Sequence, residues 1–123
     1  TSKVRKDAAW LPRFGFEMEL PGDKELVTYY GKGPEENYID LCHNVRTGLF
    51  EHQVDQDYVP KAFPQEQGNH TDTRFVKLSD RRGCGILFRA LEDEKFYFRA
   101  THYVLEDINK ARHYCDLTKQ DTT

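Results

Sequence analysis

Apolar residues recur at every second position in several short stretches of the chain, and Gly, Pro and Asp separate these stretches. Within residues 14–20, for example, Phe14, Phe16, Met18 and Leu20 alternate with glycine or glutamate. This period of two is typical of a β-strand that buries one face. Pro21-Gly22-Asp23 then provides a tight turn. The pattern therefore predicts an all-β chain built from short antiparallel strands.

Further strands are predicted by the same alternation and by their content of β-branched and aromatic residues. The run Gly85–Ala90 is almost continuously apolar, which is typical of an interior strand covered on both faces. Turns are expected at 80–83 and 92–94. The expected strands are 14–20, 26–30, 49–54, 73–78, 85–90 and 96–100.

The apolar period changes after Thr101. Leu105, Ile108, Ala111 and Cys115 fall near one face of a helix, and acidic residues precede basic ones along it. We expect one short helix over 104–114, polar tails at 1–10 and 118–123, and a single domain over 1–123. Six strands and one helix do not close a large sandwich, so we expect the chain to be the first part of a larger fold.

Composition excludes several classes of function. The 123 residues carry a net charge of −3 with both signs interspersed, so there is no basic stripe for nucleic acid. Three cysteines without paired spacing argue against a disulfide framework. No apolar run is long enough to span a bilayer. We expect a soluble chain, in the cytoplasm or the periplasm, without nucleic-acid or membrane partners.

The first polar loop runs from Gly31 to Asp40 and is rich in Gly, Pro, carboxylates and carboxamide. Oxygens of Glu36, Asn37 and Asp40 are suited to hydrogen bonds with sugar hydroxyls. The alternative is structural, with Asn37 and Asp40 bonded to nearby backbone groups. Pro34 stands where a helix would have to open, so the Gly-x-Gly here is not a dinucleotide fingerprint.

The second polar loop runs from Pro64 to Asp72 and carries Glu66, Asn69 and His70. These side chains are also candidates for sugar contacts, and a hydrogen-bonding structural role is the alternative. His70 and Asp72 are too few to hold a metal without a distant ligand, so we expect no metal site. The tentative carbohydrate-binding residues are Glu36, Asn37, Asp40, Glu66, Asn69 and His70.

Hydrolysis of a glycoside by this chain alone is not expected. That reaction normally needs two carboxyl groups flanking the scissile bond, about 5–5.5 Å apart for retention of configuration. Glu35 and Glu36 are adjacent, and adjacent side chains of an extended segment point in opposite directions. We therefore predict no catalytic residue in this chain.

Four stretches, spread in order over most of the chain, resemble one family. The stretch Leu11–Phe16 resembles its opening strand, and Tyr30–Asp40 is very similar to its Gly-x-Gly-Pro-x-Glu-Asn-Tyr-x-Asp loop. Pro64–Arg74 looks like its Pro-Gln-Glu-Asn-Gly-Asn-Arg/His-Thr-Asp-Val-Arg stretch. Ala100–Tyr103 resembles its closing segment. The family is the small-chain (C-terminal, domain 5) region of glycoside hydrolase family 2 β-galactosidases. Leu41 and Gln67 depart from its pattern, where Arg and Asn are usual.

The resemblance implies a partial galactose-mutarotase-like supersandwich within a large retaining β-galactosidase. In that family the catalytic glutamates lie on a separate (β/α)₈ barrel, and Mg and Na, where used, lie on other domains. The implied partners are that barrel, a galactoside substrate through the parent enzyme, and further copies in an oligomer. The resemblance implies no cofactor in this chain.

Three functions follow as hypotheses. The first is a non-catalytic segment of a β-galactosidase that packs against the catalytic barrel and helps to form the active-site mouth. The second is a free-standing carbohydrate-binding module. The third is a mutarotase-like epimerase, which would need a His acid and a carboxylate base, such as His70 or His102 with Glu66.

Overall fold

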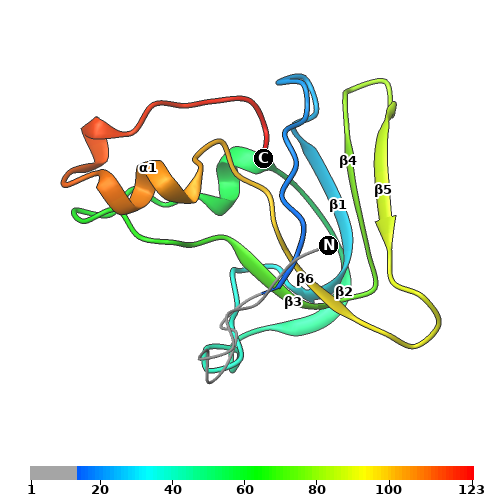
Figure 1. Ribbon diagram of the computed structural model, residues 1–123. Helices are drawn as coiled ribbons and strands as arrows, with labels where there is room; N and C mark the ends of the chain where they lie inside the picture. The colour runs from blue at the N-terminus through cyan, green and yellow to red at the C-terminus, as the bar shows by residue number, and fades with distance from the viewer. Residues whose placement is uncertain (1–13) are drawn as a thin grey trace, which may run out of the picture.

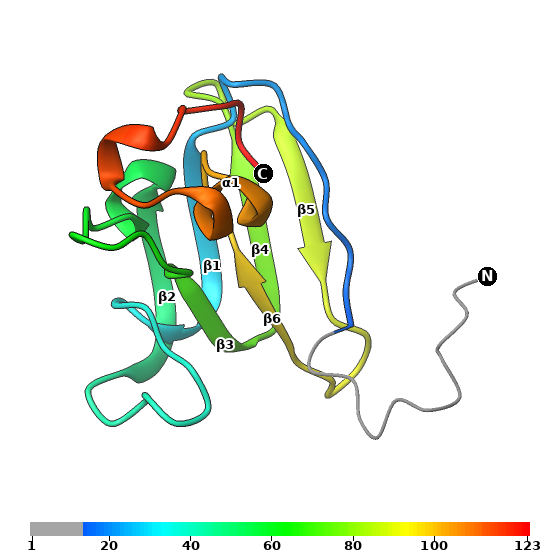
Figure 2. The same cartoon turned by 60° about the vertical axis from the view of Figure 1, so that its left-hand side comes forward.

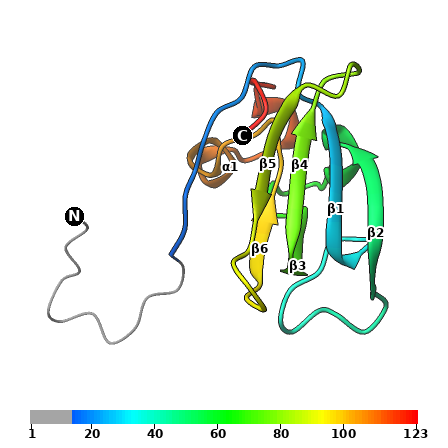
Figure 3. The ribbon, with the colours of Figure 1, turned by 90° about the vertical axis from the view of Figure 1, so that its right-hand side faces the viewer.

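A four-stranded antiparallel sheet forms the larger layer of the structure, which a computed structural model describes for residues 14–123. Its strands are β1 (Leu26–Gly33), β2 (Arg46–Gln53), β4 (Phe75–Ser79) and β5 (Gly85–Arg89). They lie side by side in the order β2-β1-β4-β5 (Figure 3). β1 is thus a central strand, while β2 and β5 form the two edges.

A second, two-stranded sheet packs against one face of the first. It pairs β3 (Asn69–Thr73) with β6 (Phe96–Arg99). The structure also contains three short helical segments: η1 (Val54–Asp57), α1 (Leu105–Lys110) and η2 (Tyr114–Asp116). β3 and β6 lie over β1 and β4, with α1 beside them (Figures 1 and 2). No helix among residues 14–123 has the length and apolar character needed to cross a membrane.

The core lies between the two sheets because β1 turns alternate residues inward. Val27 and Tyr29 are fully buried, whereas Thr28 and Tyr30 on the other face are only partly covered. The Tyr29 ring packs against Phe50 of β2 and Phe98 of β6, with ring centroids 5.4 and 5.1 Å apart. Large aromatic rings therefore supply much of the buried area of a small core.

Gly31 allows the two sheets to approach closely. A Cβ atom at this position would lie 2.8 Å from Thr73 Oγ1 and 3.0 Å from Thr73 Cα. Any larger residue would push β3 away from β1, because the neighbouring atoms include backbone. The first glycine of the polar loop is thus a packing residue inside a strand.

The predicted all-β antiparallel sandwich with one short helix near the C-terminus is confirmed. Strands predicted at 26–30, 49–54, 73–78 and 96–100 correspond to β1, β2, β4 and β6, with bounds that shift by a few residues. The turn predicted at 80–83 joins β4 to β5.

The strand predicted over 14–20 is wrong. Phe14 is 81% exposed, Phe16 is fully exposed, and only Leu20 forms a single bridge, to Thr122. The segment runs as an extended chain outside both sheets (Figure 3). Alternation marks an apolar face, but no described strand pairs with residues 14–19. The predicted tail at 1–10 lies outside the described residues.

The interior position predicted for Gly85–Ala90 is also wrong. β5 is an edge strand, and Leu87 is 59% exposed. Within residues 14–123 no strand pairs with its outer edge. The apolar run indicated side chains suited to burial, but within the described residues only Phe88 of β5 is partly buried against the core.

The helix is shorter than predicted. It ends at Lys110, and the backbone of Ala111 is extended. The amides of Arg112 and His113 donate to Asp116 Oδ2 at 3.1 and 2.9 Å, which draws the chain into a separate turn. Such local bonds between side chain and backbone compete with helix continuation.

Two further stretches differ from expectation. Residues 69–72, predicted as loop, belong to β3, because Asn69 and His70 pair with Arg99 and Phe98 of β6. The end of the expected C-terminal tail is instead held in the structure. The Thr123 and Thr101 backbones exchange two hydrogen bonds of 2.7 and 2.8 Å, and Thr122 is buried.

Asp80 organises the turn between β4 and β5. Its Oδ1 accepts hydrogen bonds from the amides of Arg82 and Cys84 at 2.8 and 2.9 Å, and Lys24 Nζ lies 3.4 Å from Oδ2. Partial burial opposes ionisation, but the amides of Cys84 and Arg82 together with Lys24 hold the pKa of Asp80 below its usual range.

We predict that Asp80→Asn lowers the Tm at pH 6 and has no effect once the pH falls below the folded-state pKa of Asp80. A depressed pKa contributes stability above the unfolded value, about 3.9, and loses it as the pH falls through the folded value. Thermal melts followed by circular dichroism between pH 6 and pH 2 test this. Asp93→Asn, in an exposed turn, is the control. A Tm difference that persists at the lowest pH would contradict the prediction.

Candidate functional site

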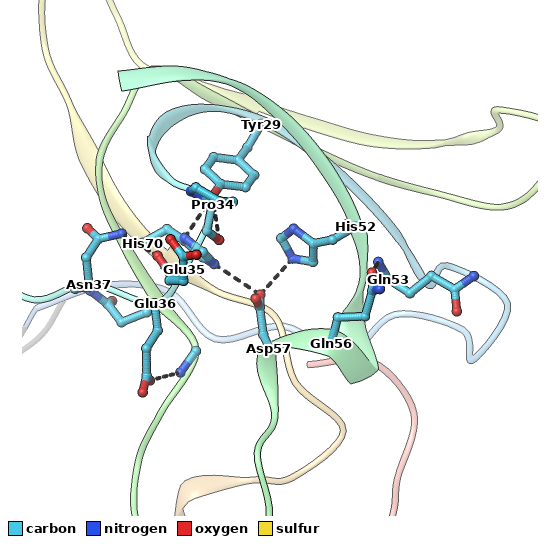
Figure 4. Close-up of polar contacts among 12 residues, drawn as sticks. Tyr29, Pro34, Glu35, Glu36, Asn37, His52, Gln53, Gln56, Asp57 and His70 are labelled. Atoms are coloured by element: carbon cyan, nitrogen blue, oxygen red, sulfur yellow. Dashed lines mark hydrogen bonds and ion pairs between the residues drawn. The ribbon is translucent and has the colours of Figure 1, made fainter. Parts of the chain in front are cut away.

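Two histidines share one carboxylate between the sheets. His52 Nε2 lies 2.7 Å from Asp57 Oδ2, and His70 Nε2 lies 3.1 Å from the same oxygen (Figure 4). The three residues come from β2, η1 and β3 respectively. We call them the His-Asp-His cluster. Their ligand atoms all lie within 4.8 Å, and they form the one such group of possible metal ligands found within residues 14–123.

Tyr29 extends the cluster into the core. Its hydroxyl lies 3.0 Å from His70 Nδ1 and donates a 3.4 Å hydrogen bond to the Pro34 carbonyl. Both Tyr29 and His70 are fully buried. The His70 ring also stacks on Phe98 at a centroid distance of 5.1 Å. His70 is therefore held on both ring nitrogens and on one face.

The charge state of the cluster follows from its contacts. Burial tends to raise the pKa of Asp57, but hydrogen bonds from His52 and His70 outweigh it and hold the pKa below its usual range. Burial, together with the charges of Asp57 and Glu35, raises the pKa of Tyr29 well above its usual value. At neutral pH, Asp57 is therefore ionised and Tyr29 keeps its proton.

Asn37 joins the first polar loop to β3. Its Nδ2 donates to the carbonyls of Lys32 and Glu35 at 2.9 and 3.0 Å. Its Oδ1 accepts from the amide and the hydroxyl of Thr71 at 2.9 and 2.6 Å. Asn69 adds two bonds to the Asn37 backbone. Asn37 is fully buried, so the hydrogen-bonding capacity of its amide is used inside the protein.

Glu36 makes a second link between the two polar segments. Its Oε2 accepts a 2.7 Å hydrogen bond from the Gly68 amide, and its Oε1 lies 3.8 Å from Lys61 Nζ. Glu66 lies 3.7 Å from an Arg99 guanidinium nitrogen. Asp40 is exposed on the loop between β1 and β2.

The structure thus gathers Glu36, Asn37 and Asn69 into one network and places His70 in the His-Asp-His cluster. Asp40 lies apart. The structural role considered for Asn37 is present, and contact of any of the six residues with a sugar stays a prediction. The sequence patterns did not identify His52 and Asp57 as candidate site residues. Their spacing from His70 carries no motif, and only the fold brings the three together.

The acid–base pair considered for an epimerase is not assembled around His70. Its Nε2 faces Asp57, while Glu66 lies beside Arg99. His102 Nδ1 donates a 3.0 Å hydrogen bond to the Gln120 carbonyl. Asp72 pairs with Lys32 at 3.1 Å, so His70 and Asp72 do not form a site together.

A shallow groove of about 460 Å³ lies on the outer face of the four-stranded sheet, away from the cluster. Tyr30 and Phe75 form part of its floor, with ring planes 16° apart. Two arginines and the single carboxylate Glu92 also line it. One carboxylate does not provide the acid pair that glycoside hydrolysis requires.

We predict that Gly68→Ala destabilises the chain by about 2–3 kcal/mol. Gly68 has a φ of +79°, and an added Cβ would lie 3.1 Å from both Cβ and the carbonyl oxygen of Asp57. Gly83→Ala is the matched control, because its φ is +84° and the nearest atom is 3.8 Å away. Backbone strain alone should cost about 1 kcal/mol there. Urea denaturation measures both, and equal losses would refute the packing argument.

We predict that Asn37→Ala costs about 3 kcal/mol or more, because it leaves the Thr71 amide and hydroxyl and two carbonyls without their partner. The control Asn44→Ala changes an exposed residue in the same loop and should stay within about 0.5 kcal/mol. Urea midpoints of the two variants give the comparison. Similar midpoints would show that the network contributes little.

Comparison with known proteins identifies the family. The family described as "Beta galactosidase small chain" matches residues 1–123. The chain is 37% identical to a beta-galactosidase of Streptococcus thermophilus over 112 residues, covering 91% of this chain and 11% of that protein. It is 37% identical to a beta-galactosidase of Staphylococcus xylosus over 116 residues, with coverage of 94% and 11%.

A yeast relative shows the same coverage pattern. The beta-galactosidase of Kluyveromyces lactis is 32% identical over 108 residues, which is 88% of this chain and 10% of that protein. The chain therefore spans about a tenth of the length of the curated relatives that it matches. With its whole length matched, this chain belongs to the beta-galactosidase small-chain family.

Proposed function

We propose that the chain is a non-catalytic segment of a glycoside hydrolase family 2 β-galactosidase, which hydrolyses terminal β-D-galactosides with retention of configuration. The observation that carries the proposal is the family match over the whole chain, combined with coverage of about a tenth of each relative. A piece of this size is expected to borrow its catalytic acids from elsewhere in the enzyme. Its sandwich would be the first part of a galactose-mutarotase-like supersandwich.

The disposition of carboxylates supports a non-catalytic role. Asp57 is almost enclosed and is bonded to two histidines, so it does not face an open cleft. The Glu36 carboxylate accepts a hydrogen bond from the Gly68 amide. The outer groove holds one carboxylate, Glu92. None of these arrangements resembles two acids placed on either side of a glycosidic bond.

The outer face of the four-stranded sheet is the proposed contact with the catalytic barrel. Leu49 and Leu87 are 65% and 59% exposed on the edge strands β2 and β5, and Tyr30 and Phe75 lie between them in the sheet. Exposed large apolar side chains gathered on one face in this way are typical of an interface. Covering it would also complete the burial that the apolar run of β5 indicates.

The loop between β1 and β2 is the proposed contribution to the active-site mouth. Asp40 is exposed there, with Ile39 and Leu41 beside it. Of the six candidate sugar-binding residues, Asp40 has the most open position. Asn37 and His70 are enclosed, and we propose that they act by holding the loop in place.

We predict that the isolated chain does not hydrolyse nitrophenyl β-galactoside but restores activity to the parent enzyme lacking these residues. The double variant Leu49→Asp/Leu87→Asp should fail to restore activity, because charge would be placed in the interface. Leu49→Met/Leu87→Met keeps the face apolar and is the control. Circular dichroism verifies that each variant folds. Turnover by the isolated chain, or full rescue by the aspartate variant, would contradict the proposal.

A further inference from the structure

The His-Asp-His cluster has a composition that the β-galactosidase assignment leaves unused. It places two imidazole nitrogens and one carboxylate oxygen within 4.8 Å of one another, from three separate elements. We infer that His52, Asp57 and His70 bind one divalent transition-metal ion, for which Zn²⁺ is the test ion. This inference replaces the sequence-based expectation of no metal in the chain.

The ligand types determine the class of ion. Imidazole and carboxylate together are a common ligand set for zinc, and two histidines with one carboxylate also serve non-haem iron. Mg²⁺ and Ca²⁺ prefer oxygen ligands and waters. The cluster should therefore select a first-row transition metal over Mg²⁺ and Ca²⁺.

The distances are close to those of a bound ion. Ligand atoms about 2.0–2.1 Å from a tetrahedral Zn²⁺ lie roughly 3.3 Å from one another. Asp57 Oδ2 lies 2.7 Å from His52 Nε2 and 3.1 Å from His70 Nε2. These two separations need to open by a few tenths of an ångström. The two imidazole nitrogens, which lie within 4.8 Å of each other, also need to settle near the tetrahedral value.

The protons can be placed without an additional acid or base. On binding, a hexahydrated ion would exchange five waters for the three side-chain ligands and keep one to complete a tetrahedral shell. Each imidazole would bind it through a deprotonated Nε2 and carry its proton on Nδ1. For His70, the Nδ1–H then donates to the Tyr29 hydroxyl, 3.0 Å away. Tyr29 can accept this bond because its own proton can turn to the Pro34 carbonyl, 3.4 Å away. A second partner of this kind orients metal-binding histidines and fixes their tautomer.

The cluster lies where an ion could enter from the surface and where a bound ion would connect the two sheets. The side chains of His52 and Asp57 keep 12% and 8% exposure, so one side of the cluster reaches the surface, while His70 is enclosed. An ion held by all three residues would connect β2, η1 and β3, and therefore both sheets. Metal bound to the folded state alone raises its stability by mass action.

The test uses the complete gene product that carries this chain, stripped of metal with EDTA. Zn²⁺ is titrated against a chromophoric chelator, and Co²⁺ absorption is recorded as a second probe. Asp57→Asn preserves shape and one acceptor oxygen, and His52→Gln changes a residue that retains some exposure. His43→Gln, at an exposed histidine, is the control.

We expect the wild type and His43→Gln to bind one equivalent of Zn²⁺ more than the cluster variants, with affinity at this site reduced at least about 100-fold in those variants. Tyr29→Phe should weaken binding about 10-fold, as expected for an outer partner. Mg²⁺ should not compete. The Tm should rise with Zn²⁺ in the wild type and by less in Asp57→Asn.

Equal stoichiometry and affinity in the wild type and the folded cluster variants would overturn the inference and leave a hydrogen-bonded network only. X-ray absorption on the wild type with one equivalent of Zn²⁺ keeps the test valid if a variant fails to fold. A shell containing two imidazoles at about 2.0–2.1 Å supports the site. A shell without imidazole, or no uptake, excludes it.

Discussion

The buried amide of Asn37 is the interaction on which the arrangement of the two polar segments depends. It satisfies two carbonyls of its own loop and two donors of Thr71, a residue of β3 34 positions later in the chain. Leaving such groups unpaired in the interior costs more than the net gain from a typical hydrogen bond. The loop after β1 therefore has to close over β3, and Gly31 provides the space for that approach.

The two faces of the four-stranded sheet differ in how far their side chains are covered, because β3 and β6 pack on the inner face only. The inner face holds Tyr29, Phe50 and the His-Asp-His cluster, all packed or hydrogen-bonded. The outer face presents Leu49 and Leu87 to solvent on its two edge strands. We propose that a small-chain segment that is inactive alone and docks through its outer face would account for both. The family match shows that the chain belongs to the beta-galactosidase small-chain family.

The sequence predicted the strands whose alternation could be matched by a neighbour, such as β1 and β6. It failed where alternation had no partner, as at Phe14 and Phe16, because a periodic pattern describes one face and not the strand beside it. It also misplaced Asn69 and His70 in a loop. Polar residues in a buried strand are stable only when distant groups pair with them, and here the partners are Asn37 and Asp57.

Both polar segments were predicted as the site, and the links between them through Glu36 and Asn37 could only be found in the fold. The same holds for the His-Asp-His cluster, in which His52 lies in the edge strand β2 and Asp57 lies in the helical turn η1. Residue type alone gave no reason to connect them, since the distances depend on how η1 turns after β2.

Amide hydrogen exchange can compare the isolated 123-residue chain with the complete gene product. If the outer face and edge of the sheet are covered in the complete protein, we expect the amides of β5 to exchange much more slowly there. The Thr71 amide, bonded to Asn37, should be protected in both and serves as the internal reference. Equal exchange of β5 in the two samples would contradict the account.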